Sequence, residues 1–75
     1  MAILLDFKKV REDSQEVEYV FGYPEMDRRL VIDKTTQEGR PADGTRDRNF
    51  TAILVKILRG QQALTTWPET GTYAA

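Results

Sequence analysis

The chain contains neither cysteine nor histidine among its 75 residues. Without cysteine there is no disulfide, no thiolate metal site and no cysteine nucleophile. Without histidine the chain lacks the most frequent general base, the most frequent transition-metal ligand and the usual pH switch. We therefore expect no enzyme activity, no cofactor and no metal site. Because small secreted domains usually depend on disulfides, the missing cysteines also favour a cytoplasmic protein.

Long hydrophobic runs and a strong net charge are missing too. The longest apolar runs, 1–5 and 52–55, are far shorter than a membrane-spanning helix of roughly 20 residues. Lys8 and Lys9 follow the first run, which is the wrong order for a signal peptide. The net charge of −1 gives no long-range field that would attract nucleic acid. These absences favour a small soluble domain without a membrane partner and argue against nucleic acid as a partner.

The composition that is present is typical of a globular protein, with 40% hydrophobic and 31% charged residues. A chain of this length has room for a single domain, so we treat 1–75 as one unit. We expect its core to cover 1–63 and a C-terminal tail, 64–75, to pack on that core.

Three segments alternate apolar and polar residues with the period that is typical of half-buried strands. They cover 2–10, 16–23 and 28–33 or 34. The short polar connections between them predict an antiparallel meander, because parallel strands need longer crossovers. The apolar residues of one face are Ile3, Leu5, Phe7, Val17, Tyr19, Phe21, Tyr23, Leu30 and Ile32.

A second group of apolar residues recurs at helical spacing and predicts one amphipathic helix. These residues are Phe50, Ile53, Leu54, Ile57 and Leu58. We expect Thr45, or alternatively Asp43, to cap the N-terminus of this helix. Gly60 is expected to end it, unless the pattern continues to Ala63. The predicted fold class is α+β: a three-stranded antiparallel meander packed on one amphipathic α-helix, in the order β-β-β-α, with a C-terminal tail.

Two segments fall outside this pattern. The polar stretch 35–44 is interpreted as a mobile loop, because it has almost no hydrophobic anchor. The tail holds the only tryptophan, Trp67, and we expect this indole to be partly buried against the domain. Residues 70–74 are a candidate edge strand.

Arginines gather around the predicted N-terminus of the helix. Free N–H groups at such an end favour anions, and guanidinium groups would complete a phosphate or carboxylate site. The residues of this candidate anion site are Arg40, Arg46 and Arg48. In the alternative interpretation they are solvated and paired with neighbouring carboxylates. Together with Arg28 and Arg29 they also define a weak nucleic-acid or anion-binding alternative for the whole protein.

The sheet face away from the helix carries a few apolar residues among charged ones, and the tail adds more. The predicted interaction patch consists of Leu4, Val20, Val31, Met26, Trp67 and Tyr73. Exposed apolar patches with polar rims often mark partner sites or homodimers. In the alternative interpretation the tail folds back over this face and closes it. The function predicted from the sequence is a non-enzymatic protein-interaction or accessory module that binds an unknown protein partner or a second copy.

The strings FGYPEMDRRLVIDK and TWPETGTYAA resemble segments of small uncharacterised actinobacterial proteins. The resemblance covers most of the chain and includes no diagnostic motif. It implies no activity, no ligand and no site residue.

Overall fold

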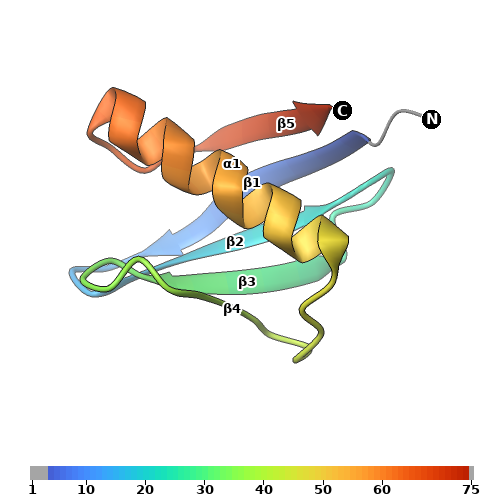
Figure 1. The fold of residues 1–75 in the computed structure, drawn as a ribbon, viewed down its shortest axis with the longest axis horizontal. Coiled ribbons are helices and arrows are strands. Elements are labelled where there is room, and N and C mark those ends of the chain that lie inside the picture. Colours follow the sequence, from blue (N-terminus) through green and yellow to red (C-terminus); the bar gives the residue numbers. More distant parts are fainter. Residues whose placement is uncertain (1–3, 75) are drawn as a thin grey trace.

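The computed structural model describes residues 4–74, in which a five-stranded antiparallel sheet carries one α-helix on one face (Figure 1). The elements in chain order are β1 (Leu4–Glu12), β2 (Glu16–Gly22), β3 (Arg28–Asp33), β4 (Gly39–Pro41), α1 (Arg48–Leu64) and β5 (Thr70–Ala74). The strands lie side by side in the order β4-β3-β2-β1-β5. The predicted α+β class is confirmed, but the sheet has five strands rather than three.

The central part of the sheet is the predicted meander of β1, β2 and β3. Phe7 pairs with Phe21 and Tyr19 pairs with Leu30, so the large apolar residues stand on one face. A bulge between Lys9 and Arg11 shifts the register of β1. The strand continues to Glu12, beyond the predicted end at residue 10, so the connection to β2 is shorter than predicted. Ile3, which we predicted for the same face, lies outside the described residues.

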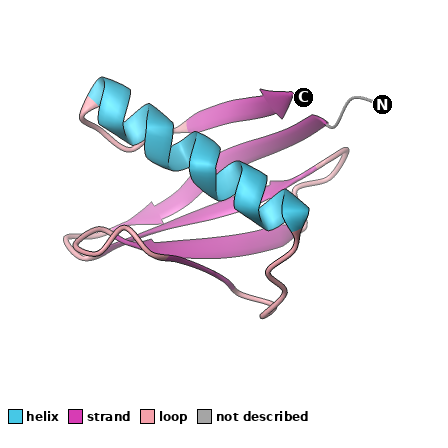
Figure 2. Ribbon diagram, in the orientation of Figure 1, coloured by secondary structure: helices cyan, strands magenta, loops and turns pink. Residues whose placement is uncertain are grey.

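The core lies between this face and α1, which crosses the sheet diagonally (Figure 2). The predicted stripe is confirmed, because Phe50, Ile53 and Ile57 are buried and Leu54 and Leu58 pack beside them. The fully buried side chains are Val17, Tyr19, Phe21, Leu30, Ile32, Phe50, Ile53 and Ile57. Tyr23 was wrongly predicted to join them. It is 57% exposed, because β2 ends at Gly22 and the chain turns away from the core.

The ends of α1 differ from the predicted ones. Asp47 is the N-cap, and its Oδ1 accepts the Phe50 backbone N–H at 2.9 Å. The predicted cap Thr45 is wrong, and the alternative Asp43 instead accepts the backbone N–H of Thr45 at 2.9 Å, outside the helix. The helix also passes Gly60 and ends at Leu64. A Cβ added at Gly60 would lie 3.4 Å from the Pro68 ring, in ordinary van der Waals contact.

The two additional strands lie at opposite edges of the sheet. The predicted loop 35–44 contains β4, which pairs with β3, and the candidate strand 70–74 is β5, which pairs with β1. The tail therefore extends the sheet at its edge, and no described tail residue crosses the face opposite α1. Trp67, which precedes β5, is half-buried as predicted. Across the described residues, we find no helix with the length and apolar character that a membrane crossing requires.

Candidate functional site

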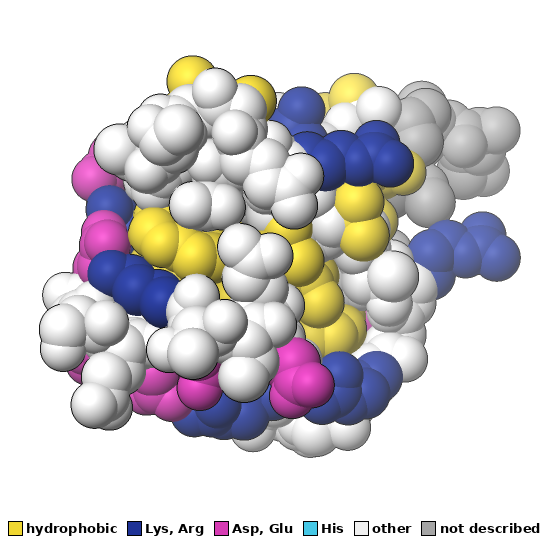
Figure 3. All heavy atoms as spheres, turned by 60° about the vertical axis from the view of Figure 1, so that its left-hand side comes forward, with side chains coloured by type: hydrophobic (Ala, Val, Ile, Leu, Met, Phe, Trp, Pro, Cys, Tyr) yellow, Lys and Arg dark blue, Asp and Glu magenta, His cyan; other side chains and the backbone are white. Residues whose placement is uncertain are grey.

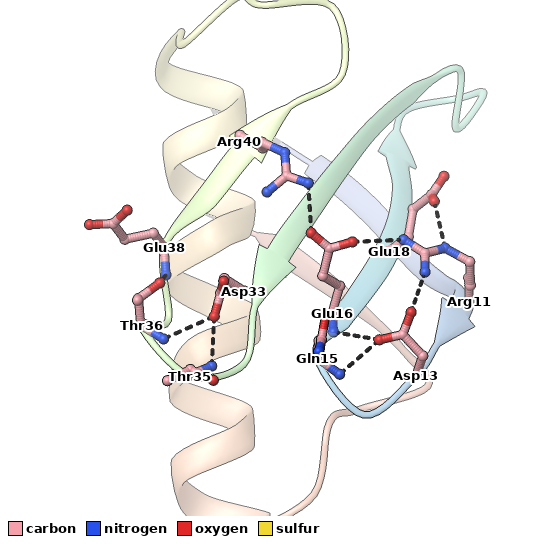
Figure 4. Close-up of polar contacts among 10 residues, drawn as sticks. All are labelled: Arg11, Asp13, Gln15, Glu16, Glu18, Asp33, Thr35, Thr36, Glu38 and Arg40. Atoms are coloured by element: carbon pink, nitrogen blue, oxygen red, sulfur yellow. Dashed lines mark hydrogen bonds and ion pairs between the residues drawn. The ribbon is translucent and has the colours of Figure 1, made fainter.

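The sheet face opposite α1, called the open face below, is covered by paired charges (Figure 4). Arg11 contacts Glu16 at 3.4 Å and Glu18 at 3.2 Å. Arg29 binds Glu18 at 2.9 Å, and Arg40 binds Glu16 at 2.7 Å. Each exposed pair contributes little to stability. The network nevertheless neutralises this face, so it presents a hydrated surface rather than an apolar one.

The residues of the predicted interaction patch do not share one face. Leu4, Val20 and Val31 alternate with core residues and so lie on the open face, where both valines are half-buried. Trp67 and Tyr73 instead pack against the core on the side of α1. Met26 lies in the β2–β3 connection, where it is exposed and lines a hollow beside β5.

The arginines named from the sequence are mostly engaged within the chain. Arg28 donates to Asp43 at 3.1 Å and to Asp47 at 2.9 Å, and its guanidinium carbon lies 4.9 Å from the centre of the Phe21 ring. Arg29 and Arg40 belong to the open-face network. These three cations are therefore already neutralised by carboxylates.

The three arginines of the candidate anion site do not converge on one point. Arg46 donates to the Gly39 carbonyl at 3.2 Å. Arg40 and Arg46 line one hollow of about 240 Å³, which Asp33 and Glu38 share. Arg48 begins α1, is exposed and does not line that hollow. An anion in the hollow would meet carboxylates as well as guanidinium groups, and nucleic-acid or anion binding stays a prediction that no observed contact favours.

The clearest asymmetry of the molecule is between the two edges of its sheet, beginning with β4. The ladder bond from Asp33 N–H to the Glu38 carbonyl fixes which backbone groups of β4 point outward, namely those of Gly39 and Pro41. Arg46 donates a hydrogen bond to the outward Gly39 carbonyl, and the Gly44 N–H donates one to the Pro41 carbonyl at 3.2 Å. Proline has no N–H to offer. Of the outward groups of β4, only the Gly39 N–H remains without a partner among the described residues.

The β5 edge has none of these protections. Lys9 N–H donates to the Glu69 carbonyl at 2.7 Å, and this bond sets the alternation along the β1–β5 ladder. The backbone groups of Thr70, Thr72 and Ala74 consequently point away from β1. Within residues 4–74, no bond outside the ladder occupies these groups. The strand has no proline and no charged residue, which are the usual means of blocking an edge.

Both sides of β5 have surface features that a neighbouring strand would meet. On the open face, Asp6, Lys8 and Met26 line a hollow of about 250 Å³ together with Thr70 and Thr72. The Thr72 hydroxyl donates to Asp6 at 2.7 Å and holds this strand on β1. On the side of α1, Gly71 lies directly against the Phe7 ring, because an added Cβ would come within 2.5 Å of it.

A larger hollow, of about 550 Å³, lies where the chain leaves α1 and approaches β5. Figure 3 brings this end of the molecule forward and shows hydrophobic side chains between charged ones. Lys9 binds Glu12 at 2.5 Å and Glu69 at 2.9 Å, while Lys34 binds Glu12 at 2.7 Å. Lys9, Glu12 and Glu69 line the hollow, and Lys34 binds Glu12 from outside this lining, so each of these charges already has a partner of opposite sign. These contacts tie the segment before β5 to β1 and so fix the position of the edge.

The same contacts shift several pKa values. Hydrogen bonds from Lys34 and then Lys9 lower the pKa of Glu12, and hydrogen bonds to Glu12 and then Glu69 raise the pKa of Lys9. At the helix N-terminus, the bonds from the Phe50 N–H and then Arg28 lower the pKa of Asp47. Burial raises the pKa of Tyr19, whose hydroxyl donates to the Pro68 carbonyl at 2.7 Å.

We expect the free energy of unfolding to be flat between about pH 6 and 9 and to fall on both sides of this range. Carboxylates with a lowered folded pKa, such as Glu12 and Asp47, stabilise the fold above their unfolded pKa and lose this contribution on acidification. Tyr19 stays neutral in the fold, so stability is lost above about pH 10, where the unfolded tyrosine ionises. Urea unfolding in a series of buffers measures this profile, and a slope between pH 6 and 9 would contradict it.

The unprotected edge was missed from the sequence, although its signal is present there. The segment Thr70–Ala74 has no charge, whereas Gly39–Pro41 carries both an arginine and a proline. Among the described residues there is no cluster of three or more potential metal-binding side chains. No family model matches the chain, and neither curated proteins nor solved structures gave a match. The resemblance to actinobacterial proteins accordingly stays a prediction.

Proposed function

We propose that this chain is a non-enzymatic protein-interaction module that binds its partner by adding a strand of that partner to the outer edge of β5. The single observation that supports the proposal is the contrast between the two edges. At β4, side-chain and backbone groups occupy both outward carbonyls, whereas the outward groups of Thr70, Thr72 and Ala74 are accessible. An edge of this kind is a template for a further strand.

The binding free energy of the added strand would come from backbone hydrogen bonds and from side-chain contacts on both faces of the sheet. Each net backbone hydrogen bond contributes about 0.5–1.5 kcal/mol. Side chains of the added strand alternate between the faces. On the open face they would meet the hollow lined by Met26, Asp6 and Lys8, and on the other face they would meet Tyr73. Because this hollow contains one acid and one base, the site favours uncharged or zwitterionic neighbours rather than a highly charged segment.

A titration with a strand-forming peptide tests this function without knowledge of the natural partner. The probe is a capped Thr-Val-Thr-Val-Thr peptide added to the isotopically labelled full chain and followed by NMR. We expect chemical-shift changes and slower amide exchange at Thr70, Thr72 and Ala74, because these N–H groups become bonded. The residues of β4 should not respond, since their outward carbonyls already have partners.

Two controls separate strand addition from unspecific contact. The same peptide with every backbone nitrogen methylated should leave the spectrum unchanged. Thr72→Pro removes the central outward N–H and should abolish the response, whereas Thr72→Val keeps that N–H and should preserve it. Equal responses at both edges, or no response of β5 to the unmethylated peptide, would rule out the proposed binding mode.

A further inference from the structure

We infer that the partner is a second copy of this chain, whose β5 pairs antiparallel with β5 about a two-fold axis at Thr72. This inference rests on the proposed strand-addition function and names its partner. In such a pair Thr72 stands opposite Thr72 of the second copy, and Thr70 stands opposite the second copy's Ala74. The sheets join into one continuous sheet with both helices on the same side, because a two-fold axis normal to the sheet preserves its faces.

The backbone of β5 is self-complementary in this register. Its outward groups belong to Thr70, Thr72 and Ala74, which are spaced symmetrically around Thr72. Rotation about the axis therefore places each outward N–H opposite an outward carbonyl of the second copy. The inward groups of Gly71 and Tyr73 stay on β1. Dimerisation thus requires no bond of the monomer to break.

The side chains of β5 are also self-complementary on the side of α1. When Thr72 faces itself, Tyr73 of one copy stands directly opposite Gly71 of the other. This is a position without ladder hydrogen bonds, where side chains approach most closely. Gly71 has no side chain, and the Phe7 ring of the same chain packs directly over it and is only 3% exposed. The half-buried Tyr73 ring of the second copy would lie over the outer side of Gly71, next to the Phe7 ring.

Charge does not oppose this pairing. No residue of Thr70–Ala74 is charged, so the two strands bring no like charges into direct opposition. The nearest charges on the open face, Asp6 and Lys8, have opposite signs. The β4 edge would be a poorer choice, because Arg40 would approach its own copy and Pro41 cannot donate.

Sedimentation of the unmodified full chain over a concentration series tests the dimer directly. Paired edges of this length form an interface at the small end of the known range, so we expect a concentration-dependent dimer rather than a permanent one. The weight-average mass should rise towards twice the monomer mass of 8.6 kDa. A mass that stays at the monomer value up to a chain concentration of about 1 mM would overturn the inference. It would mean a dissociation constant above about 1 mM, which corresponds to a binding free energy weaker than about 4 kcal/mol.

Single-cysteine variants test the register, because the natural chain has no cysteine. In a hydrogen-bonded antiparallel pair the opposing Cα atoms lie about 5.5 Å apart, within disulfide reach. Thr72→Cys should therefore form an intermolecular disulfide rapidly under mild oxidation. Thr70→Cys is the matched control on the same strand, since the two copies of residue 70 are offset by roughly 13 Å along the strands. Thr36→Cys, in the β3–β4 connection at the far edge, is a control for random collision.

The expected result is a rate of disulfide formation for Thr72→Cys at least ten times that of either control. Equal rates for Thr72→Cys and Thr70→Cys would exclude this register and overturn the inference. The failures of the two proposals can be told apart. If the strand peptide binds β5 while the chain sediments as a monomer, strand addition stands and the second copy is excluded. If the peptide also fails, both proposals fall.

Discussion

The substitution Ile53→Ala should remove a large part of the stability of this protein. Ile53 is fully buried at the centre of the helix face that covers the sheet. Truncation of a buried isoleucine typically costs about 2–5 kcal/mol, through lost transfer free energy and the cavity that remains. A domain of this size has a total stability on the order of 4–11 kcal/mol. Equilibrium unfolding in urea should therefore show a strongly lowered midpoint or a partly unfolded protein without denaturant.

Val55→Ala is the matched control, because it truncates a β-branched residue on the same helix. Val55 is 40% exposed and lies on the outer side of α1. Its loss should change the free energy of unfolding by about 0.5 kcal/mol or less, and the higher helix propensity of alanine offsets part of that change. Similar losses for the two variants would contradict the position of the core described above.

Gly22→Ala should be the second strongly destabilising change. Gly22 ends β2 at a φ of +145°, a backbone conformation that residues other than glycine rarely adopt. A Cβ added there would also collide with the backbone carbonyl oxygen of Glu25, which cannot rotate away as a side chain could. We expect a loss of roughly 2–4 kcal/mol, combining strain of about 1–3 kcal/mol with the displacement of the β2–β3 connection.

Gly44→Ala separates backbone strain from collision. Gly44 also has a positive φ, +77°, but an added Cβ would meet no atom within 4 Å. Only the cost of the left-handed conformation applies there, about 1–2 kcal/mol. In urea, Gly22→Ala should have a clearly lower free energy of unfolding than Gly44→Ala. The reverse order would show that the turn after β2 relaxes without cost.

The central meander and the helix could be predicted from the sequence because both depend on local periodicity. The alternation around Tyr19 and Phe21 can bury an apolar face only as a strand, and the spacing of Phe50, Ile53 and Ile57 can do so only as a helix. These patterns also predicted correctly that the stripe covers the aromatic face. The cap could not be resolved, because Asp43, Thr45 and Asp47 are all good capping residues.

The short strands depend on contacts that no local pattern encodes. Gly39–Pro41 is only three residues long and has no period, so it becomes a strand through pairing with β3. Tyr23 continues the alternation of β2 in the sequence, yet the turn at Gly22 places it in solvent. The predicted interaction patch was drawn from the same local patterns, which did not show that its residues lie on two different faces of the sheet.

The sequence by itself determined the α+β class, the central strands, the helical stripe and the absence of cysteine and histidine chemistry. These properties follow from residue types and from spacing along the chain. Only the tertiary structure decided which strands became edges and which edge was protected. That outcome depends on distant segments meeting, as when Arg46 reaches the Gly39 carbonyl while Thr70–Ala74 lies along β1 with its outer groups accessible. Exposed backbone groups are a property of strand order, and strand order is set by packing across the whole domain.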